Sequence, residues 1–329
     1  MIKLLLLAGR KANRWEARIL LDNPLKNPGL EKGVKAVSQK SLSPIFLDSV
    51  PSPANAQNLV RRRKLKRRIV FGWYGGKFSH LDWLLPLLPN CHHYCEPFGG
   101  SAAVLLNRLP SPVETYNDLD GDVVNFFQVL RDQKDELISA IALTPFSREE
   151  FYWAIYSNDE PLSYLEKARR FFVRARQART GLAQTATLGR WANCKNTSRA
   201  GMSGVVSRWL GSVEDLPDIA LRLLRVQIEN RPALEIIKLY DGPDTLFYCD
   251  PPYLHSTRGD HKAYGFEMDE AEHRELALVL NHCRGKVAVS GYRCDIMDEL
   301  YTGWRRFDAP PKHCHSIKKI RQEVLWMNY

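Results

Sequence analysis

From residue 69 onward, short apolar runs alternate with longer segments of helical periodicity. Apolar runs bounded by polar or turn residues indicate buried strands, and they occur at 92–98, 113–118, 226–230, 245–249, 286–292 and 323–329. Helices are predicted between them, at 101–109, 119–132 and 269–285. Strands that alternate with helices are typical of a mostly parallel sheet with helices on both faces, so we expect a doubly wound α/β fold.

Several helix ends carry recognisable signals. Ser101 is placed to cap the helix at 101–109, because serine side chains accept bonds from the first free N–H groups. The helix at 269–285 is acidic at its start, and Gly285 is expected to close it. Ser147 and Glu150 have the spacing of a capping box, which predicts a further helix start at that point.

The segment 141–215 differs from the α/β pattern on either side. A second helix is predicted at 161–179, and a stretch rich in Gly, Ser, Thr and Asn follows at 180–212. We interpret 141–215 as a helical, loop-rich insertion into a catalytic domain formed by 69–140 and 216–329. Its Trp191 and Trp209 fit a nucleic-acid-reading surface better than a core, although an amphipathic helix pair with solvated arginines is the alternative.

The net charge of +10 is concentrated in two places. Residues 1–68 contain 16 Lys or Arg and 4 Asp or Glu, whereas 167–208 contain ten basic residues and no acid. Two basic segments on a balanced body indicate a polyanionic partner, most plausibly nucleic acid. Residues 1–68 are expected to be a disordered extension; the alternative is an arm that adds salt-sensitive DNA affinity.

The seven cysteines point to a reducing, cytoplasmic environment. The apolar run in the opening MIKLLLLAGRK is too short for a signal sequence or a membrane span, so no membrane partner is expected. Cys91 and Cys95 lie within the CHHYC stretch, but it lacks a second pair of ligands at zinc-finger spacing. No metal is therefore expected.

Three strand ends carry groups that suit a ligand site, because ligands of open α/β sheets bind beyond the carboxyl ends of the strands. Gly99 and Gly100 let the backbone approach a ligand closely. Asp118 is suited to the two hydroxyls of a ribose, but it could equally cap the helix that begins near residue 120. Asp250 opens the tetrapeptide DPPY (250–253), in which two prolines fix an acid and an aromatic ring just beyond a strand.

These groups describe a site for a nucleoside-containing cofactor beside a flat substrate that carries an amino group. The constellation resembles the N6-adenine DNA methyltransferases of the DNA adenine methylase type. The resemblance covers roughly 70–329 and rests on motifs in that family's order, which are WYGGK (73–77), EPFGGS (96–101), Asp118 in YNDLD, DPPY (250–253), SGY (290–292) and EVLWMNY (323–329). It implies a Rossmann-like methyltransferase sheet with a target-recognition insertion.

The resemblance also implies roles for single residues. S-adenosyl-L-methionine would be held by Asp118 at its ribose and by a group of further residues, which are Trp73, Lys77, Glu96, Phe98, Gly99, Gly100 and Asp250. Asp250 and the carbonyl of Pro251 would each accept a hydrogen bond from one N–H of the adenine amine. This would expose the lone pair of the amine to the methyl group. Pro251 and Pro252 pre-set these acceptors, and Tyr253 offers a face for base stacking, typically worth about 1–3 kcal/mol.

An adenine cannot react inside a duplex, so the target base is expected to be flipped out of double-stranded DNA. The insertion would grip phosphates and read base edges, for which Arg and Asn are suited. The candidates are Arg190, Asn193, Lys195, Asn196, Arg199 and Arg208. One flipped base needs only a monomer, and the resemblance implies an enzyme of bacterial or phage origin that acts at the nucleoid.

Pro232 is a departure from the family pattern, since relatives often carry an acid there that is associated with the cofactor's adenine ring. Glu229, Asn230 or a backbone group are the possible substitutes. Four other functions compete with the main interpretation. Methylation of cytosine N4 usually goes with Ser in place of Asp250, and methylation of a protein glutamine goes with Asn. A Rossmann dehydrogenase lacks its G-x-G-x-x-G, and an inactive DNA-binding relative would not need Asp250, Tyr253, Lys77 and Asp118 intact.

Overall fold

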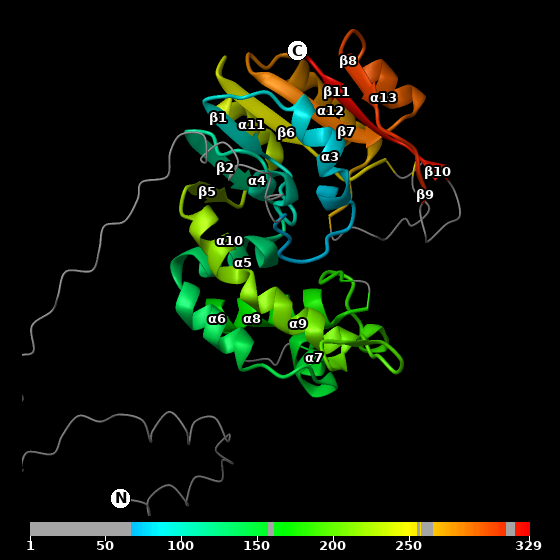
Figure 1. Cartoon of the computed structure of the whole chain (residues 1–329). Helices are drawn as coiled ribbons and strands as arrows, with labels where there is room; N and C mark the ends of the chain where they lie inside the picture. The colour runs from blue at the N-terminus through cyan, green and yellow to red at the C-terminus, as the bar shows by residue number, and fades with distance from the viewer. Residues whose placement is uncertain (1–66, 157–160, 180, 255–256, 258–265, 314–319) are drawn as a thin grey trace, which may run out of the picture. The chain divides into compact units, whose positions relative to one another are not determined.

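A computed structural model describes residues 67–156, 161–179, 181–254, 257, 266–313 and 320–329. Within these residues a central seven-stranded sheet has the order β5-β2-β1-β6-β7-β11-β8. Strands β5, β2, β1, β6 and β7 are parallel, whereas β11 runs antiparallel to both of its neighbours (Figure 1). The strands are β1 (His93–Glu96), β2 (Val113–Asn117), β5 (Val226–Glu229), β6 (Thr245–Cys249), β7 (Lys286–Tyr292), β8 (Arg305–Asp308) and β11 (Glu323–Met327).

The sheet is covered on both faces, which confirms the doubly wound α/β prediction. Successive residues of β6 point to opposite faces of the sheet, and each face is packed: Leu246 belongs to one hydrophobic cluster and Phe247 to the other. All five residues of β6 are buried, as expected for a continuous apolar run at the centre of a parallel sheet. One cluster includes α3 (Leu81–Leu84), α4 (Ala103–Asn107) and α5 (Gly121–Asp132), and the other includes α11 (Ala233–Tyr240), α12 (Glu270–Asn281) and α13 (Asp295–Leu300).

Helices α6 to α9 are gathered beyond α5 on the side away from the central sheet, and α10 leads from them back to β5 (Figure 1). Helix α8 packs against α5, where the rings of Phe126 and Phe172 stack with centroids 5.5 Å apart. Hydrophobic packing is therefore continuous from the sheet into the segment 141–215. The elements of this part are α6 (Lys134–Ala142), α7 (Arg148–Ile155), α8 (Tyr164–Gln177), η3 (Leu188–Arg190), β3 (Ser198–Arg199), β4 (Met202–Ser203), α9 (Gly204–Glu214) and α10 (Leu216–Leu223).

Four further short elements remain in the described part of the chain. They are η1 (Lys77–His80), η2 (Leu85–Leu87), β9 (Lys312–His313) and β10 (Ile320–Arg321). Residues 1–66, which include most of the basic extension, lie outside the described residues. No helix in the described part of the chain is both long enough and apolar enough to cross a membrane.

Two predicted helix starts are confirmed by their caps. The side chain of Ser147 accepts the N–H of Glu150, and Asp269 forms a full capping box with Glu272. The cap at Ser101 is wrong: α4 begins at Ala103, and its N-cap residue is Ala102, which has a left-handed backbone (φ 54°) and no side-chain cap.

Helix α12 ends at Asn281, four residues before the predicted Gly285. Instead of closing the helix, Gly285 lies in the turn into β7, where the carboxylate of Asp241 accepts its N–H. A side chain there would come within 2.9 Å of two backbone oxygens, those of Gly242 and Thr245. Glycine is therefore required for close backbone packing.

The surface placement of Trp209 is also wrong. Its ring is 3% exposed and lies 5.6 Å from the ring of Phe172 in the helical core. Trp191 is half-buried, between Phe146 and the guanidinium of Arg148, which lies 4.7 Å from its ring. These tryptophans therefore stabilise the insertion from within, although charged side chains surround them in the sequence.

Candidate active site

A cavity of about 250 Å³ opens beyond the carboxyl ends of β1, β2 and β6. Strand β1 has β2 on one side and β6 on the other, so the order in which strands are added to the sheet reverses at β1. Ligands of open α/β sheets bind at such a switch point. All the residues that the sequence predicts to bind the cofactor line this cavity. They are Trp73, Lys77, Glu96, Phe98, Gly99, Gly100, Asp118 and Asp250. Pro252 lines it too, whereas Pro251 and Tyr253 are not among its lining residues.

The glycine turn after β1 is shaped by two aromatic rings of the protein. Gly100 has φ +49°, and a Cβ there would lie 2.5 Å from Nε1 of Trp73. A Cβ on Gly99 would lie 2.2 Å from the ring of Tyr116. The hydroxyl of Tyr116 donates to the carbonyl of Gly100 over 2.7 Å. Glycine is thus required at both positions because Trp73 of WYGGK and Tyr116 of β2 pack against this turn. The sequence predicted glycine here for a different reason, the close approach of a ligand.

Asp118 is held by backbone donors at the end of β2. One carboxylate oxygen accepts the N–H of Gly100 at 2.7 Å and the other accepts the N–H of Asp120 at 2.9 Å. The helix-cap alternative for Asp118 is wrong, because the N-cap of α5 is Asp120, whose side chain accepts from Asp122. Burial raises the pKa of Asp118 to about 6. Each oxygen keeps a further lone pair with which to accept a ligand hydroxyl.

Asp250, at the end of β6, forms a buried ion pair with Lys77. The Lys77 ammonium lies 2.7 Å from Oδ1 and 2.8 Å from Oδ2, and it also donates to the carbonyl of Gly75. Ser290, in β7, donates to Oδ1 over 3.0 Å. Burial raises the pKa of Asp250, and the adjacent ammonium opposes that shift. Burial alone would lower the pKa of Lys77, but the attraction of Asp250 and Glu323 outweighs it and the pKa is raised.

Tyr253 ends the tetrapeptide, and its ring is 4% exposed. Its hydroxyl donates to Glu323 over 2.6 Å and lies 3.2 Å from Asp250. The ring contacts Tyr292 edge to face at 4.8 Å, and the Lys77 ammonium lies 5.0 Å from its centre. A base could therefore stack on this ring only after Tyr292 moves.

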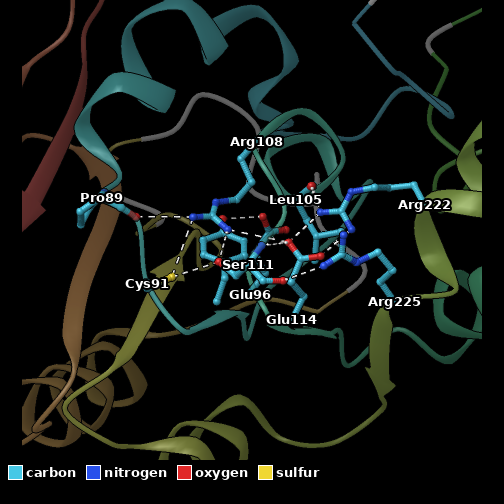
Figure 2. Close-up of polar contacts among 10 residues, drawn as sticks. Pro89, Cys91, Glu96, Leu105, Arg108, Ser111, Glu114, Arg222 and Arg225 are labelled. Carbon is cyan, nitrogen blue, oxygen red and sulfur yellow. Dashed lines mark hydrogen bonds and ion pairs between the residues drawn. The ribbon is translucent and has the colours of Figure 1, made fainter.

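The carboxyl group of Glu96 belongs to a buried polar cluster (Figure 2). The hydroxyl of Tyr94 donates to it over 2.7 Å, and the guanidinium of Arg108 lies 3.9 Å from the Tyr94 ring. Behind them the two carboxylate oxygens of Glu114 accept bonds of 2.5 and 2.7 Å from Arg222, which lies on α10. Burial raises the pKa of Glu96 to about 8, so this group can exchange a proton near neutral pH.

The residues predicted to contact DNA are all exposed and lie outside the cavity lining. Lys195 precedes the β3–β4 hairpin, Arg199 lies in β3, and Arg208 lies in α9. Arg190, at the end of η3, donates to the carbonyl and the hydroxyl of Thr185. Asn193 and Asn196 are also exposed. These basic and amide side chains are thus all exposed along residues 190–208 of the insertion.

Pro232 lines the cavity and is followed by Ala233 and Leu234, so this wall is apolar where an acid was expected. Neither proposed side-chain substitute reaches it. Glu229 accepts the hydroxyl of Tyr240, and the Asn230 amide donates to the carbonyl of Asp118. The backbone is the remaining possibility among those proposed from the sequence.

Several side chains that shape the site have no role in the sequence prediction, among them Ser290, Glu323, Arg231 and Gln184. Ser290 lies in the SGY motif and Glu323 in the EVLWMNY motif, but the sequence predicts no role for either side chain. Arg231 and Gln184 line the cavity from loops without a motif. For Ser290 and Glu323 the signal was a polar residue at the end of an apolar strand, whereas nothing in the local pattern marks Gln184.

Numbered along the chain, the central strands follow the order 3-2-1-4-5-7-6, with one antiparallel strand inserted near the edge. This sheet, with its cavity at the switch point, defines a Rossmann-like methyltransferase fold. Residues 73–322 match the family model of the D12 class N6 adenine-specific DNA methyltransferases, and the chain belongs to this family. That membership favours N6-adenine methylation of DNA over the other functions considered.

Similarity to named relatives is consistent with this family. The chain is 24% identical to the type II methyltransferase M1.LlaDCHI of Lactococcus lactis subsp. cremoris over 83% of its own length and 99% of the relative. It is 25% identical to the DNA N-6-adenine-methyltransferase of Escherichia phage P1 over 74% of its length and 33% of the relative. A DNA adenine methylase of Vibrio cholerae is 25% identical over 72% of this chain and 86% of the relative.

Proposed function

We propose that this methyltransferase uses S-adenosyl-L-methionine to methylate the N6 amine of an adenine that is flipped out of duplex DNA, with Asp250 at the reacting amine. The observation that carries the proposal is the position of the Asp250 carboxylate. It lies at the end of β6, faces the cavity and is fixed by Lys77 and Ser290. A preorganised acceptor of this kind is suited to an amine that gains positive charge as it reacts.

The donor groups of the cavity fit the proposed cofactor. Asp118 keeps two acceptor sites for ribose hydroxyls, and the apolar wall at Pro232 and Leu234 suits a purine ring. Glu96 and Lys77 supply polar groups for the amino-acid end, with Trp73 and Phe98 beside them. When it is bound, S-adenosyl-L-methionine supplies a methyl group that is activated by a positively charged sulfur.

Asp250 and Pro251 act on the substrate amine. The carboxylate accepts a hydrogen bond from one N–H and the Pro251 carbonyl from the other. The nitrogen is thereby drawn toward a tetrahedral geometry, and its lone pair is less delocalised into the ring. Lys77 keeps Asp250 ionised despite its burial, because an opposite charge at 2.7 Å offsets the loss of hydration. Pro251 and Pro252 fix the backbone, so little reorganisation is needed as the amine reacts.

Residues 141–215 form the proposed target-recognition part, and 69–140 with 216–329 form the proposed catalytic part, in a protein that acts as a monomer. Tyr253 is proposed to stack on the base once Tyr292 moves from its ring, while Lys77 stays paired with Asp250. The exposed basic and amide side chains of the insertion are proposed to hold the phosphates and read the base edges. They are Arg190, Asn193, Lys195, Asn196, Arg199 and Arg208.

The test is transfer of labelled methyl from S-adenosyl-L-methionine to unmethylated duplex DNA, followed by digestion and identification of the base. Label should appear as N6-methyladenine, and Asp250→Ala should lose it. Asp135→Ala, which removes a carboxylate that is 87% exposed on α6, is the matched control and should keep wild-type activity. Label on cytosine, or full activity in Asp250→Ala, would contradict the proposal.

A further inference from the structure

One loop of the insertion is tied at its base and reaches the cavity. Ala178 and Trp191 form an antiparallel bridge. Beside it, the N–H of Arg179 donates to the carbonyl of Arg190 over 2.6 Å, and the N–H of Ala192 donates to the carbonyl of Gln177 over 2.8 Å. We call the described residues 181–190 within this closure the cavity loop.

The cavity loop packs directly against the catalytic part of the chain. Gly181 lies so close to Gly72 that a Cβ on Gly72 would be 2.9 Å from the Gly181 oxygen. Ala183 is 5% exposed and belongs to the same hydrophobic cluster as the sheet residues on that face. Next to it, Gln184 lines the cavity. The loop is therefore anchored directly before the residue that faces the ligand site.

Gln184 is linked to Asp118 through one intermediate residue. Its amide Nε2 donates to Oδ2 of Asp120 over 2.9 Å. The backbone N–H of Asp120 in turn donates to Oδ1 of Asp118 over 2.9 Å. Any change in the position of Gln184 is thus transmitted to the carboxylate proposed to hold the ribose.

The other end of the cavity loop carries a proposed DNA contact. Arg190 donates from Nη1 to the hydroxyl of Thr185 over 2.9 Å and to its carbonyl over 3.2 Å. Thr185 follows Gln184 directly in the chain. A guanidinium has five N–H donors, so Arg190 can keep Thr185 and still bind a phosphate through its other N–H groups.

We propose that Gln184 is a positioning residue that couples the cofactor site to DNA binding through the cavity loop. The inference rests on the proposed function, because it takes S-adenosyl-L-methionine and DNA as the two ligands. A ligand in the cavity fixes Gln184 and Thr185, and Thr185 holds Arg190 in place for a phosphate. DNA then loses less side-chain freedom on binding, and by linkage it strengthens binding in the cavity by the same factor.

The experiment measures the affinity for S-adenosylhomocysteine, the cofactor without its methyl group, by calorimetry with and without short fragments of unmethylated duplex DNA. For the wild-type protein we expect DNA to tighten this binding about tenfold, within the usual range of coupling between two sites. Gln184→Glu keeps the side-chain shape but replaces the donor to Asp120, so the ratio should fall to near one. Gln227→Ala, at an exposed position of β5, should keep the wild-type ratio.

The ratio separates coupling from a merely structural role. A structural role would weaken binding equally with and without DNA, and an unchanged ratio in Gln184→Glu would overturn the inference. The inference would also be overturned if DNA changed the affinity of the wild-type protein for S-adenosylhomocysteine by less than about twofold. That result would leave the proposed function intact. Failure of the wild-type protein to bind S-adenosylhomocysteine at all would instead overturn the proposed cofactor, and the coupling with it.

Discussion

The hydroxyl of Tyr253 donates to the buried carboxylate of Glu323 over 2.6 Å, and the same hydroxyl lies 3.2 Å from Asp250. Glu323 begins β11 and pairs in register with Tyr292 of β7. Two carboxyl groups therefore share one phenol, with the Lys77 ammonium beside them. Burial is the largest cause that raises the pKa of Asp250, and the Lys77 ammonium lowers it. The negative charge of Glu323 raises the pKa further.

Glu323→Gln should move the acidic limb of the kcat pH profile to lower pH. The amide oxygen still accepts the Tyr253 hydroxyl, but the charge that raises the pKa of Asp250 is gone, so Asp250 stays ionised in more acidic solution. Glu323→Ala removes the acceptor as well and should lower kcat about tenfold. Glu299→Gln, at an exposed position, is the control. An acidic limb that stays in place or moves upward in Glu323→Gln would contradict the interpretation.

Affinity for S-adenosylhomocysteine should fall as the pH drops through about 6, because the pKa of Asp118 is about 6 and its protonated form loses acceptor sites. The loss should reach up to about tenfold for each pH unit below that value. Calorimetry over this pH range measures it. Asp118→Asn should bind more weakly at neutral pH and show no such dependence on pH. A wild-type affinity that is constant through this range would exclude ribose binding by ionised Asp118.

Gly100→Ala should destabilise the protein more than Gly303→Ala does, as measured by urea unfolding. Both glycines have positive φ, which costs an alanine about 1–2 kcal/mol. Gly303 has open space around its Cβ position, whereas a Cβ on Gly100 would press on the indole of Trp73. Gly100→Ala should also weaken S-adenosylhomocysteine binding, because Trp73 lines the cavity. Equal costs at the two positions would mean that the indole moves freely.

Glu114→Gln should lower the free energy of unfolding by about 3–5 kcal/mol, because it leaves the buried charge of Arg222 without its partner. Urea denaturation monitored by tryptophan fluorescence measures this loss. Glu270→Gln, which breaks an exposed pair with Arg274 on α12, should cost less than about 1 kcal/mol. Similar losses in the two variants would show that the cluster in Figure 2 is well hydrated.

Substitution of Arg199 or Arg208 by alanine should weaken DNA binding and reduce its dependence on salt. Each lost phosphate contact should lower the slope of log affinity against log salt concentration by about 0.9. Arg293→Ala, an exposed arginine after β7, is the control. If a variant keeps the slope but loses discrimination between sequences, that arginine reads a base rather than a phosphate.

Much of the fold could be predicted because burial is encoded in local periodicity. The runs at 245–249 and 286–292 became β6 and β7 with their predicted bounds. Asp118 and Asp250 were found because parallel strands place their carboxyl ends at one edge of the sheet. The cap at Ser101 was not predictable, since Gly100 and Ala102 both adopt positive φ and Gly100 packs against Trp73, which comes from another part of the chain.

Other features depend on contacts between distant parts of the sequence. Gln184 meets Asp120 across 64 residues, and Tyr253 meets Glu323 across 70. No local pattern records such pairs. Trp209 lies in a basic segment, yet its ring packs on Phe172 because α9 and α8 meet in the helical core. Charge composition therefore marks the segment as basic, but it does not predict that its largest side chain points into the core.

The closure between Ala178 and Trp191 also bears on how new target specificities could evolve. The exposed residues from Asn193 to Arg208 lie beyond the closure, so they can vary while the loop base stays intact. A chimaera that exchanges only this outer stretch would keep the hydrogen bond from Gln184 to Asp120, and with it the proposed coupling. Exchange of the whole insertion would remove that bond. The closure at Trp191 thus separates an outer stretch that can be exchanged from a loop base that contacts the catalytic part.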